Sequence, residues 1–289
     1  MRLPGDSPPP HAEEPSAGRG LEARNASSPL LEARAVTRSF GGGGGWFGAA
    51  RPALVAVDRV SFALRPGETL GIVGESGSGK STLARMLVGL LQPSAGAVAL
   101  DGETLDLGRS GDRRRLQRRV QMVFQDPASA MNPRKTVGAS VEAPMIGLKG
   151  WDAARRKARV AELFTRVGLA PGHAGRHPHE FSGGQLQRIG VARALAAEPA
   201  IVVLDEPVSA LDVSVQAQVL ALLRELRDGS GLSLVFVSHD LAVVEALCDR
   251  VMVMRRGRVV EEGACRTVLA APREEYTCEL VDAARRLAA

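Results

Sequence analysis

The residues Gly74-Glu75-Ser76-Gly77-Ser78-Gly79-Lys80-Ser81 follow the apolar run Leu70 to Val73 and open a helical pattern that continues from Ser81 to Leu91. Glycines let successive backbone N–H groups turn inward, and a helix N-terminus adds its positive end, so such a loop suits phosphate oxygens. The spacing matches G-x-x-x-x-G-K-[ST], and a strand before it with a helix after it is the context that this motif requires. The stretch therefore predicts a phosphate-binding loop at the end of a buried strand.

The side chains of this Walker A loop have distinct predicted tasks. Lys80 is expected to bridge the outer phosphates of a nucleotide, and the Ser81 hydroxyl is expected to reach Mg²⁺. The loop thus predicts a phosphate-bearing ligand and Mg²⁺, and the family resemblance given below implies that this ligand is ATP. The residues expected to contact ATP here are Gly74, Glu75, Ser76, Gly77, Ser78, Gly79, Lys80, Ser81 and Thr82.

Apolar runs like the one before the loop recur along the chain, at Val120 to Phe124, Ile201 to Leu204 and Leu234 to Val237. Continuous β-branched runs belong in parallel strands that are covered on both faces, with helices as right-handed crossovers. We therefore expect an α/β fold with a doubly wound, mainly parallel sheet of the P-loop NTPase (RecA-like) type. In such sheets ligands bind beyond the carboxyl ends of the strands.

Composition limits the possible functions. The chain has 289 residues, 45% of them apolar and only 3% aromatic, so aromatic platforms for stacking nucleic-acid bases are scarce, and no nucleic acid is expected as a partner. The net charge is +5, and the 33 Arg against 4 Lys indicate a compositional bias. Residues 1–29 are rich in Pro, Gly, Ser and charge and are predicted to be a disordered tail. No apolar run is long enough to span a membrane.

Two adjacent carboxylates follow the run Ile201 to Leu204. Asp205 is expected at a buried strand end, where it can hold Mg²⁺ through water opposite Ser81. Glu206 points to the other side of the chain and is the natural group to orient or deprotonate the attacking water.

A second glycine-containing run, Phe181-Ser182-Gly183-Gly184-Gln185-Leu186-Gln187-Arg188, opens a helix predicted to reach about Ala197. Ser182 can cap that helix, and the glycines expose backbone N–H groups, which makes a second anion site. This run resembles the signature of ATP-binding-cassette (ABC) proteins, and the resemblance covers roughly residues 30 to 280. The chain is thus similar to the ATP-binding subunit, or nucleotide-binding domain, of an ABC transporter.

The resemblance implies further site residues. Gln125 looks like the Q-loop glutamine that contacts Mg²⁺ or water, and His239 like the switch histidine that touches the γ-phosphate. Phe40 is the candidate for the aromatic that stacks on adenine. Ser209-Ala210-Leu211-Asp212 looks like the D-loop at a dimer interface. The implied catalytic residues are Glu206, His239, Gln125 and Lys80, and the implied metal-binding residues are Ser81, Gln125 and Asp205.

In the family two cassettes dock head to tail, so that each site joins one chain's phosphate loop to the partner's signature. The signature residues and the D-loop residue expected to contact the nucleotide in this way are Ser182, Gly183, Gly184, Gln185 and Asp212. The implied partners are a second ATP-binding subunit (identical or paralogous), two transmembrane permease subunits, and a periplasmic or extracellular solute-binding protein. The expected location is the cytoplasmic face of the inner (plasma) membrane, bound peripherally through the permeases.

The resemblance also implies a division of the chain. Residues 30–289 are expected to form a single ABC ATPase domain with an antiparallel β subdomain, whose strand-like alternation covers Leu31 to Phe40 and Ala53 to Leu64. The expected parts are a nucleotide-binding core with the β subdomain (30–124 and 195–263), an inserted α-helical subdomain that carries the signature (125–194), and a C-terminal helical tail (264–289).

Within the family the match narrows to importers of oligopeptides, dipeptides or nickel. The segments that carry it are Phe124 to Pro127, Met131 to Val137, His179 to Phe181 and Glu274 to Thr277. The resemblance therefore implies an ATPase that hydrolyses ATP to ADP and phosphate, coupled to solute transport.

Other classes of function need different features. The alternative is a soluble, non-transport ABC ATPase of the repair, chromosome or translation type. Repair and chromosome types need long heptad arms between their motifs, and translation types carry two cassettes in one chain. Neither feature is present in this sequence. A nucleotide kinase or GTPase would lack the signature, and the guanine-reading N-K-x-D is absent.

Overall fold

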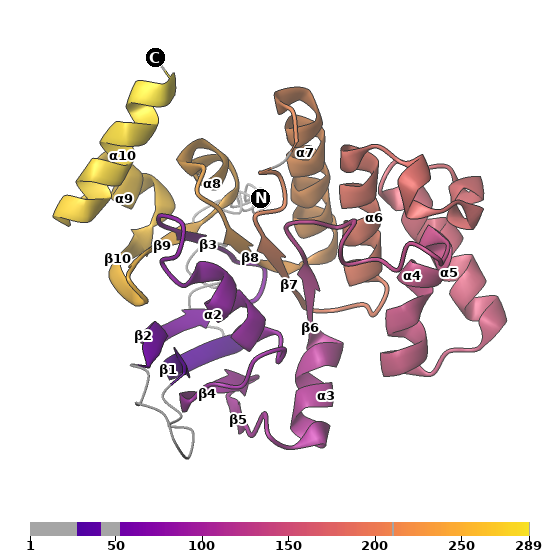
Figure 1. Cartoon of the computed structure of the whole chain (residues 1–289), viewed down its shortest axis with the longest axis horizontal. Coiled ribbons are helices and arrows are strands. Elements are labelled where there is room, and N and C mark those ends of the chain that lie inside the picture. Colours follow the sequence, from indigo (N-terminus) through magenta and orange to yellow (C-terminus); the bar gives the residue numbers. More distant parts are fainter. Residues whose placement is uncertain (1–27, 42–52, 210, 289) are drawn as a thin grey trace, which may run out of the picture.

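The computed structural model describes residues 28–41, 53–209 and 211–288. Its centre is a six-stranded sheet in the order β10-β9-β3-β8-β7-β6 (Figure 1). All neighbours in this sheet pair in parallel except β10, which pairs antiparallel to β9 at one edge. The strands are β3 (Thr69–Val73), β6 (Val120–Val123), β7 (Ile201–Asp205), β8 (Ser233–Val237), β9 (Arg250–Arg255) and β10 (Arg258–Ala264).

The four apolar runs of the sequence are the strands β3, β6, β7 and β8, which confirms the expected parallel sheet. The strand β9 was not predicted, although Val251 to Met254 is an apolar run of the same kind. It lies beside β3, so the strand that delivers the phosphate loop has a parallel neighbour on each side.

Side chains of this sheet alternate between two separate cores, as the pleat of a strand requires. Leu70 and Ile72 of β3 belong to one core, whereas Val73 belongs to the other. The same division appears in β7, where Val203 and Leu204 face opposite sides. Burial on both faces explains why these strands are continuously apolar.

A second, four-stranded antiparallel sheet lies against the first core, in the order β2-β1-β4-β5. Its strands are β1 (Leu31–Phe40), β2 (Leu54–Leu64), β4 (Ala95–Leu100) and β5 (Glu103–Leu105). The helix α2 (Lys80–Leu87) shares this core through Leu83 and Leu87. Residues 1–27 of the predicted tail are not among the described residues. The same is true of residues 42–45 in the run of five glycines, Gly41 to Gly45, that lies between the two predicted strands of the β subdomain.

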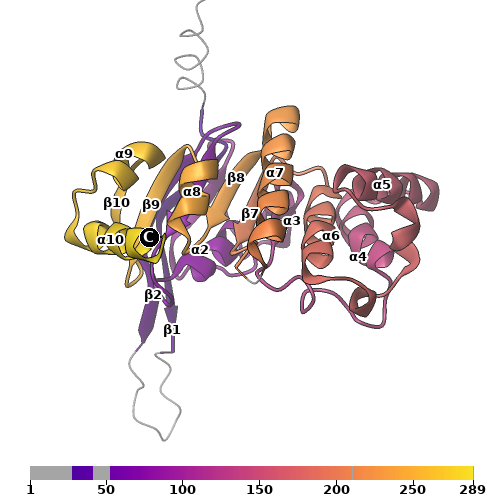
Figure 2. The same cartoon turned by 90° about the horizontal axis from the view of Figure 1, so that it is seen from above.

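A group of helices lies to one side of the central sheet, beyond β6 and β7, in both views of the molecule (Figures 1 and 2). It belongs to the second core, through residues such as Val141, Phe164 and Ile189. Its elements are α4 (Val137–Pro144), the π-helical turn η1 (Met145–Lys149), α5 (Ala153–Arg166), the 3₁₀ turns η2 (Pro171–Gly175) and η3 (Pro178–Glu180), and α6 (Gly183–Leu195).

The remaining helices are α3 (Ser110–Arg119), α7 (Val213–Ser230), α8 (Leu241–Leu247), α9 (Cys265–Ala270) and α10 (Glu275–Ala288). Figures 1 and 2 show α9 and α10 at the end of the molecule opposite α4 to α6. Within residues 28–41, 53–209 and 211–288, we find no helix that is both long and apolar enough to cross a membrane.

Candidate functional site

The phosphate loop opens into a cavity of about 590 Å³ at the carboxyl end of β3. Three residues predicted from distant parts of the sequence, Gln125, Glu206 and His239, line the same cavity. They follow β6, β7 and β8, whose carboxyl ends meet at one edge because the strands are parallel. The lining residues are Ala56, Ser76, Gly77, Gly79, Lys80, Ser81, Thr82, Gln125, Glu206 and His239.

Two glycines of the loop have conformations that exclude other residues. Gly79 has φ +102°, and a Cβ there would lie 2.2 Å from the carbonyl oxygen of Ala56. Gly74 has φ +147°, and a Cβ there would lie 2.1 Å from the carbonyl oxygen of Met254. The loop therefore packs against β2 and β9 more closely than any side chain would allow, which leaves its inner side open to a ligand.

Lys80 is buried at the first position of α2, with 4% of its surface exposed. Its Nζ donates hydrogen bonds to the carbonyl oxygens of Gly74 at 2.7 Å and Glu75 at 2.9 Å. Burial lowers the pKa of Lys80, and the nearby carboxylates of Glu206 and Asp205 oppose that effect. The ammonium group is thus held inside the loop, among carbonyl groups that a phosphate could replace.

The hydroxyl of Ser81 donates a hydrogen bond to Oδ1 of Asp205 at 2.8 Å. Asp205 ends β7 with 3% of its surface exposed, and this burial raises its pKa, while the bond from Ser81 acts in the opposite direction. A hydroxyl and a carboxylate are hard oxygen ligands of the kind that Mg²⁺ takes in proteins. The pair, beside the phosphate loop, therefore has the chemistry that a magnesium ion needs.

Glu206 lies where the carboxyl ends of β6, β7 and β8 come together. Its Oε2 accepts a hydrogen bond from Nε2 of Gln125 at 3.2 Å and lies 3.2 Å from Nδ1 of His239. The residue has φ +46°, in the left-handed region that residues with a Cβ rarely adopt, and its N–H donates to the carbonyl oxygen of Val237 at 3.0 Å. Five other non-glycine residues among those the structure describes also have positive φ, so the conformation does not by itself mark the site. Here it accompanies a carboxylate that lines the cavity.

The predicted signature residues lie elsewhere in the chain and do not line this cavity. Ser182 caps α6: its hydroxyl accepts from the N–H of Gln185 at 3.4 Å, and the Gln185 side chain accepts from the N–H of Ser182 at 3.1 Å. Gly183 and Gly184 form the first turn of α6. A Cβ on Gly184 would lie 2.2 Å from Cγ1 of Val215.

Asp212 and Phe40 also stand apart from the cavity lining. The carboxylate of Asp212 accepts from the N–H of Val215 at 2.9 Å, which lowers its pKa, and so it caps α7 within this chain. Ala210, in the predicted D-loop, lies outside the described residues. Phe40 ends β1 opposite Leu54, with 38% of its surface exposed and the guanidinium of Arg38 4.8 Å from its ring centroid.

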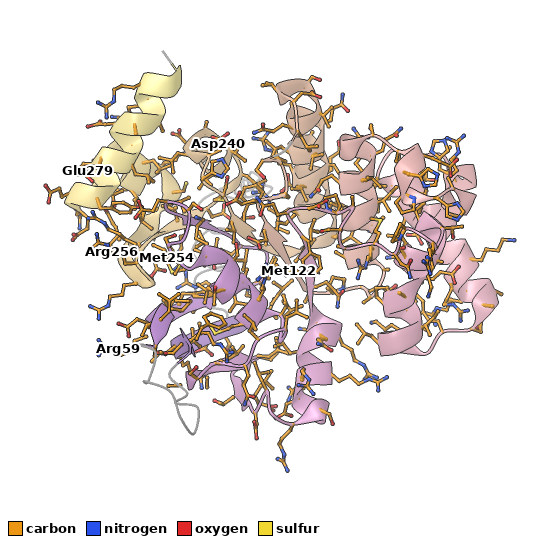
Figure 3. All side chains as sticks on the ribbon, viewed as in Figure 1. Arg59, Met122, Asp240, Met254, Arg256 and Glu279 are labelled. Atoms are coloured by element: carbon orange, nitrogen blue, oxygen red, sulfur yellow. The ribbon has the colours of Figure 1, made fainter. Side chains whose placement is uncertain are left out.

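Sequence reasoning missed the residues that support the loop from outside. Gly257, at the turn between β9 and β10, donates its N–H to the carbonyl oxygen of Ser78 at 2.9 Å. Met254 of β9 and Arg256 of this turn lie on the same side of the molecule as Glu279 of α10 (Figure 3). Tyr276 of α10 contacts the loop itself. The segment Glu274 to Thr277 stood out in the sequence, but only folding shows that it lies beside a loop about 200 residues earlier.

This combination of a phosphate loop after a parallel strand, a buried lysine and a Ser–Asp pair at the neighbouring strand end defines a P-loop nucleotide hydrolase. A comparison with family models narrows the class. Residues 57–209 match the model described as ABC transporter, which is more than half of the chain. The chain belongs to the ABC transporter family, as an ATP-binding subunit that hydrolyses ATP.

Named relatives are similar over most of the chain. The "Probable peptide ABC transporter ATP-binding protein y4tS" of Sinorhizobium fredii is 46% identical over 258 residues, covering 89% of this chain and 73% of the relative. The "Putative peptide import ATP-binding protein" of Brucella abortus is 49% identical over 237 residues, covering 82% and 71%. The "Glutathione import ATP-binding protein GsiA" of Salmonella typhimurium is 46% identical over 88% of this chain, which spans only 41% of that protein.

Solved structures agree with the fold. The dimeric structure of the ATP-binding cassette MJ0796 in a post-hydrolysis state, bound to ADP and Pi, has a TM-score of 0.71 at 29% identity, covering 82% of this chain and 99% of the other. The structure of cbiO1 from Clostridium perfringens, described as part of the ABC transporter complex cbiONQ, has the same TM-score at 26% identity, covering 85% and 92%.

Proposed function

We propose that this chain powers an ABC importer whose cargo is an oligopeptide or dipeptide, with nickel as the second candidate. The observation that carries the enzymatic part is the meeting of Gln125, Glu206 and His239 at the open side of the phosphate loop. The names of the relatives, which concern peptide and glutathione import, support the peptide class of cargo. They also favour transport over a soluble repair, chromosome or translation ATPase.

The chemistry follows from the chain's own groups. The N–H groups of the first turn of α2 have no partner within the helix, so they and the loop N–H groups can bind the phosphates of ATP. Lys80 exchanges its two carbonyl partners for phosphate oxygens. Glu206 orients and deprotonates the attacking water, Gln125 fixes the carboxylate, and His239 contacts the γ-phosphate at the mouth of the cavity.

Ser81 and Asp205 would hold Mg²⁺, with Gln125 as a further oxygen ligand. When bound, the ion neutralises charge that develops on the phosphates. The hydrogen bond between Ser81 and Asp205 keeps these two groups together at the strand end in the meantime. Phe40 is proposed to stack on adenine with the ring face that Arg38 does not cover.

The signature residues need a second chain to reach a nucleotide. Ser182 to Gln185 do not line the cavity of their own chain, yet the first turn of α6 begins with the N–H groups of Gly183 and Gly184, which have no partner within the helix. We propose that two cassettes dock head to tail, so that this turn and Asp212 complete the partner's site. The structure of the MJ0796 cassette is described as dimeric, which supports the pairing of two cassettes.

A permease partner has a suitable place to dock. A groove of about 190 Å³ lies between α3 and β6 on one side and α4, η1 and α6 on the other. Leu90, at its rim, has 52% of its surface exposed, and Phe124 and Leu148 contribute further apolar surface. Because the groove borders the segment that carries Gln125, a permease helix seated there would be sensitive to the state of the ATP site.

The single ABC domain at 30–289 has its core at 30–124 and 195–263, its helical subdomain at 125–194 and its C-terminal tail at 264–289. The chain works at the cytoplasmic face of the inner membrane, bound to two permeases, and an external solute-binding protein delivers the cargo.

The test is to recover the tagged chain from detergent-solubilised membranes of its host and to identify the integral membrane proteins that accompany it. The purified assembly, in vesicles, should show ATP-dependent uptake of labelled di- or oligopeptides. Uptake of ⁶³Ni²⁺ alone would replace the peptide proposal with the nickel one. Recovery of ATPase activity with no membrane protein would contradict the transport proposal.

The docking groove has its own test. Leu90→Asp places a charge on an exposed apolar rim and should leave the ATPase activity of the isolated chain unchanged within about twofold, because exposed substitutions cost little stability. The same variant should lose most of the co-purifying permease. Ala221→Asp, exposed on α7, is the matched control and should keep it. Equal retention of the permease by both variants would refute the groove as its docking site.

A further inference from the structure

The peptide group between Gly74 and Glu75 is held at both of its polar ends. Its carbonyl oxygen, on Gly74, accepts a hydrogen bond from Nζ of Lys80 at 2.7 Å. Its N–H, on Glu75, donates to the hydroxyl of Tyr276 at 3.0 Å. Gly74 has no Cβ to restrict rotation of this peptide group, so its orientation depends on these two contacts.

Tyr276 is itself fixed in place. Only 8% of its surface is exposed, and the guanidinium of Arg255 lies over its ring, 4.5 Å from the centroid. The residues just before it are anchored to β10, because the carboxylate of Glu261 accepts from the N–H groups of Arg273 at 3.0 Å and Glu274 at 3.2 Å. The hydroxyl that meets the phosphate loop is therefore supported by β9, β10 and α10 together.

The two contacts on the peptide group differ once a phosphate arrives. Under the ATPase role proposed above, Lys80 leaves the carbonyl of Gly74 to reach the phosphate. Tyr276 then supplies the hydrogen bond that still orients this peptide group. Without it the peptide group can rotate, and the neighbouring N–H groups of the loop lose the fixed orientation that binding of the phosphates requires.

We propose that Tyr276 is a positioning residue of the phosphate loop, through which the C-terminal helix sets the affinity for the phosphates of the nucleotide. It acts through the backbone of Glu75 and does not touch the reacting atoms. The proposal rests on the ATP-binding function of the loop and adds the C-terminal segment to the nucleotide site.

The first test is Tyr276→Phe, which keeps the ring, its packing and the contact with Arg255 and removes only the hydroxyl. The loss of one hydrogen bond predicts a Kd for ATP and for ADP about 5- to 10-fold higher, measured by calorimetry in the presence of Mg²⁺. KM for ATP should rise by the same factor, while kcat at saturating ATP stays within about twofold, since Glu206 and Gln125 are untouched.

Val281→Ala is the matched control on the same helix. Val281 is buried with 4% of its surface exposed, so the truncation loosens the packing of α10 and should lower Tm without changing either Kd by more than about twofold. Equal weakening by both variants, or an unchanged Kd in Tyr276→Phe, would overturn the proposal.

A spectroscopic test keeps both the ring and the hydroxyl of Tyr276. Tyr276 is the only tyrosine in the chain, so 3-fluorotyrosine labels this position alone. Its ¹⁹F resonance should shift on addition of ADP, and the shift should be absent in Lys80→Ala, which cannot bind the phosphates. If the unsubstituted protein binds no nucleotide, the ATPase proposal fails; if it binds and the resonance does not move, only the role of Tyr276 fails.

Discussion

Replacing Glu206 by Gln is the most direct test of the proposed chemistry. The amide has the shape of the carboxylate and retains an oxygen that can accept the hydrogen bond from Gln125 at 3.2 Å. The strained backbone at Glu206 is held by its bond to Val237, which the substitution leaves in place. The variant should therefore fold, and it loses the basic carboxylate while the phosphate loop stays intact.

The expected magnitude follows from the role of a general base. A positioned base contributes about 10²- to 10⁴-fold to a rate, so kcat should fall by that factor, equivalent to about 3 to 5 kcal/mol in the activation free energy. The affinity for ATP should change by less than about threefold, because Glu206 contacts neither the loop backbone nor Ser81 in this structure. ATP should consequently accumulate in the site and hold two chains together.

The assay combines phosphate release at saturating Mg²⁺ and ATP with size-exclusion chromatography of the same sample. Glu225→Gln is the matched control, because Glu225 is exposed on α7 and the substitution removes the same charge. That control should hydrolyse ATP like the unsubstituted protein and remain monomeric after hydrolysis. Glu206→Gln should elute as a dimer when ATP is present.

One result would refute this reasoning: hydrolysis by Glu206→Gln within tenfold of the unsubstituted chain. Glu206 would then not be the base, and its position between Gln125 and His239 would need another explanation. Loss of hydrolysis together with loss of ATP binding would instead assign Glu206 to nucleotide binding.

Two further predictions follow from burial and from close packing. Because burial raises the pKa of Asp205, the unliganded protein should lose stability as pH rises above the ordinary value of 3.8. Asp205→Asn should flatten this loss in thermal unfolding, while Mg²⁺-dependent hydrolysis falls about 100-fold or more. Gly184→Ala forces a Cβ to within 2.2 Å of Val215 and should destabilise the fold by about 1–3 kcal/mol, measured by thermal unfolding. Gly183→Ala is the control, because its Cβ would lie 3.7 Å from Leu211, and it should leave stability unchanged. Equal Tm values for the two variants would contradict the packing argument.

Much of the site could be predicted because its chemistry is local in sequence. The phosphate loop, Gln125, Glu206 and His239 each follow a continuous apolar run, and parallel strands bring such ends together at one edge. The strand β9 escaped prediction, although its apolar run is equally clear, because no ligand-binding motif follows it.

Residue types at fixed short spacings predict the fold class, the phosphate loop and the pair of carboxylates. Only folding shows that the N–H of Gly257 donates to the carbonyl oxygen of Ser78 and that Tyr276 reaches the N–H of Glu75. These contacts join the loop to segments about 180 and 200 residues later in the chain. They depend on how helices and strands pack in three dimensions, which the order of residues within any one segment does not record.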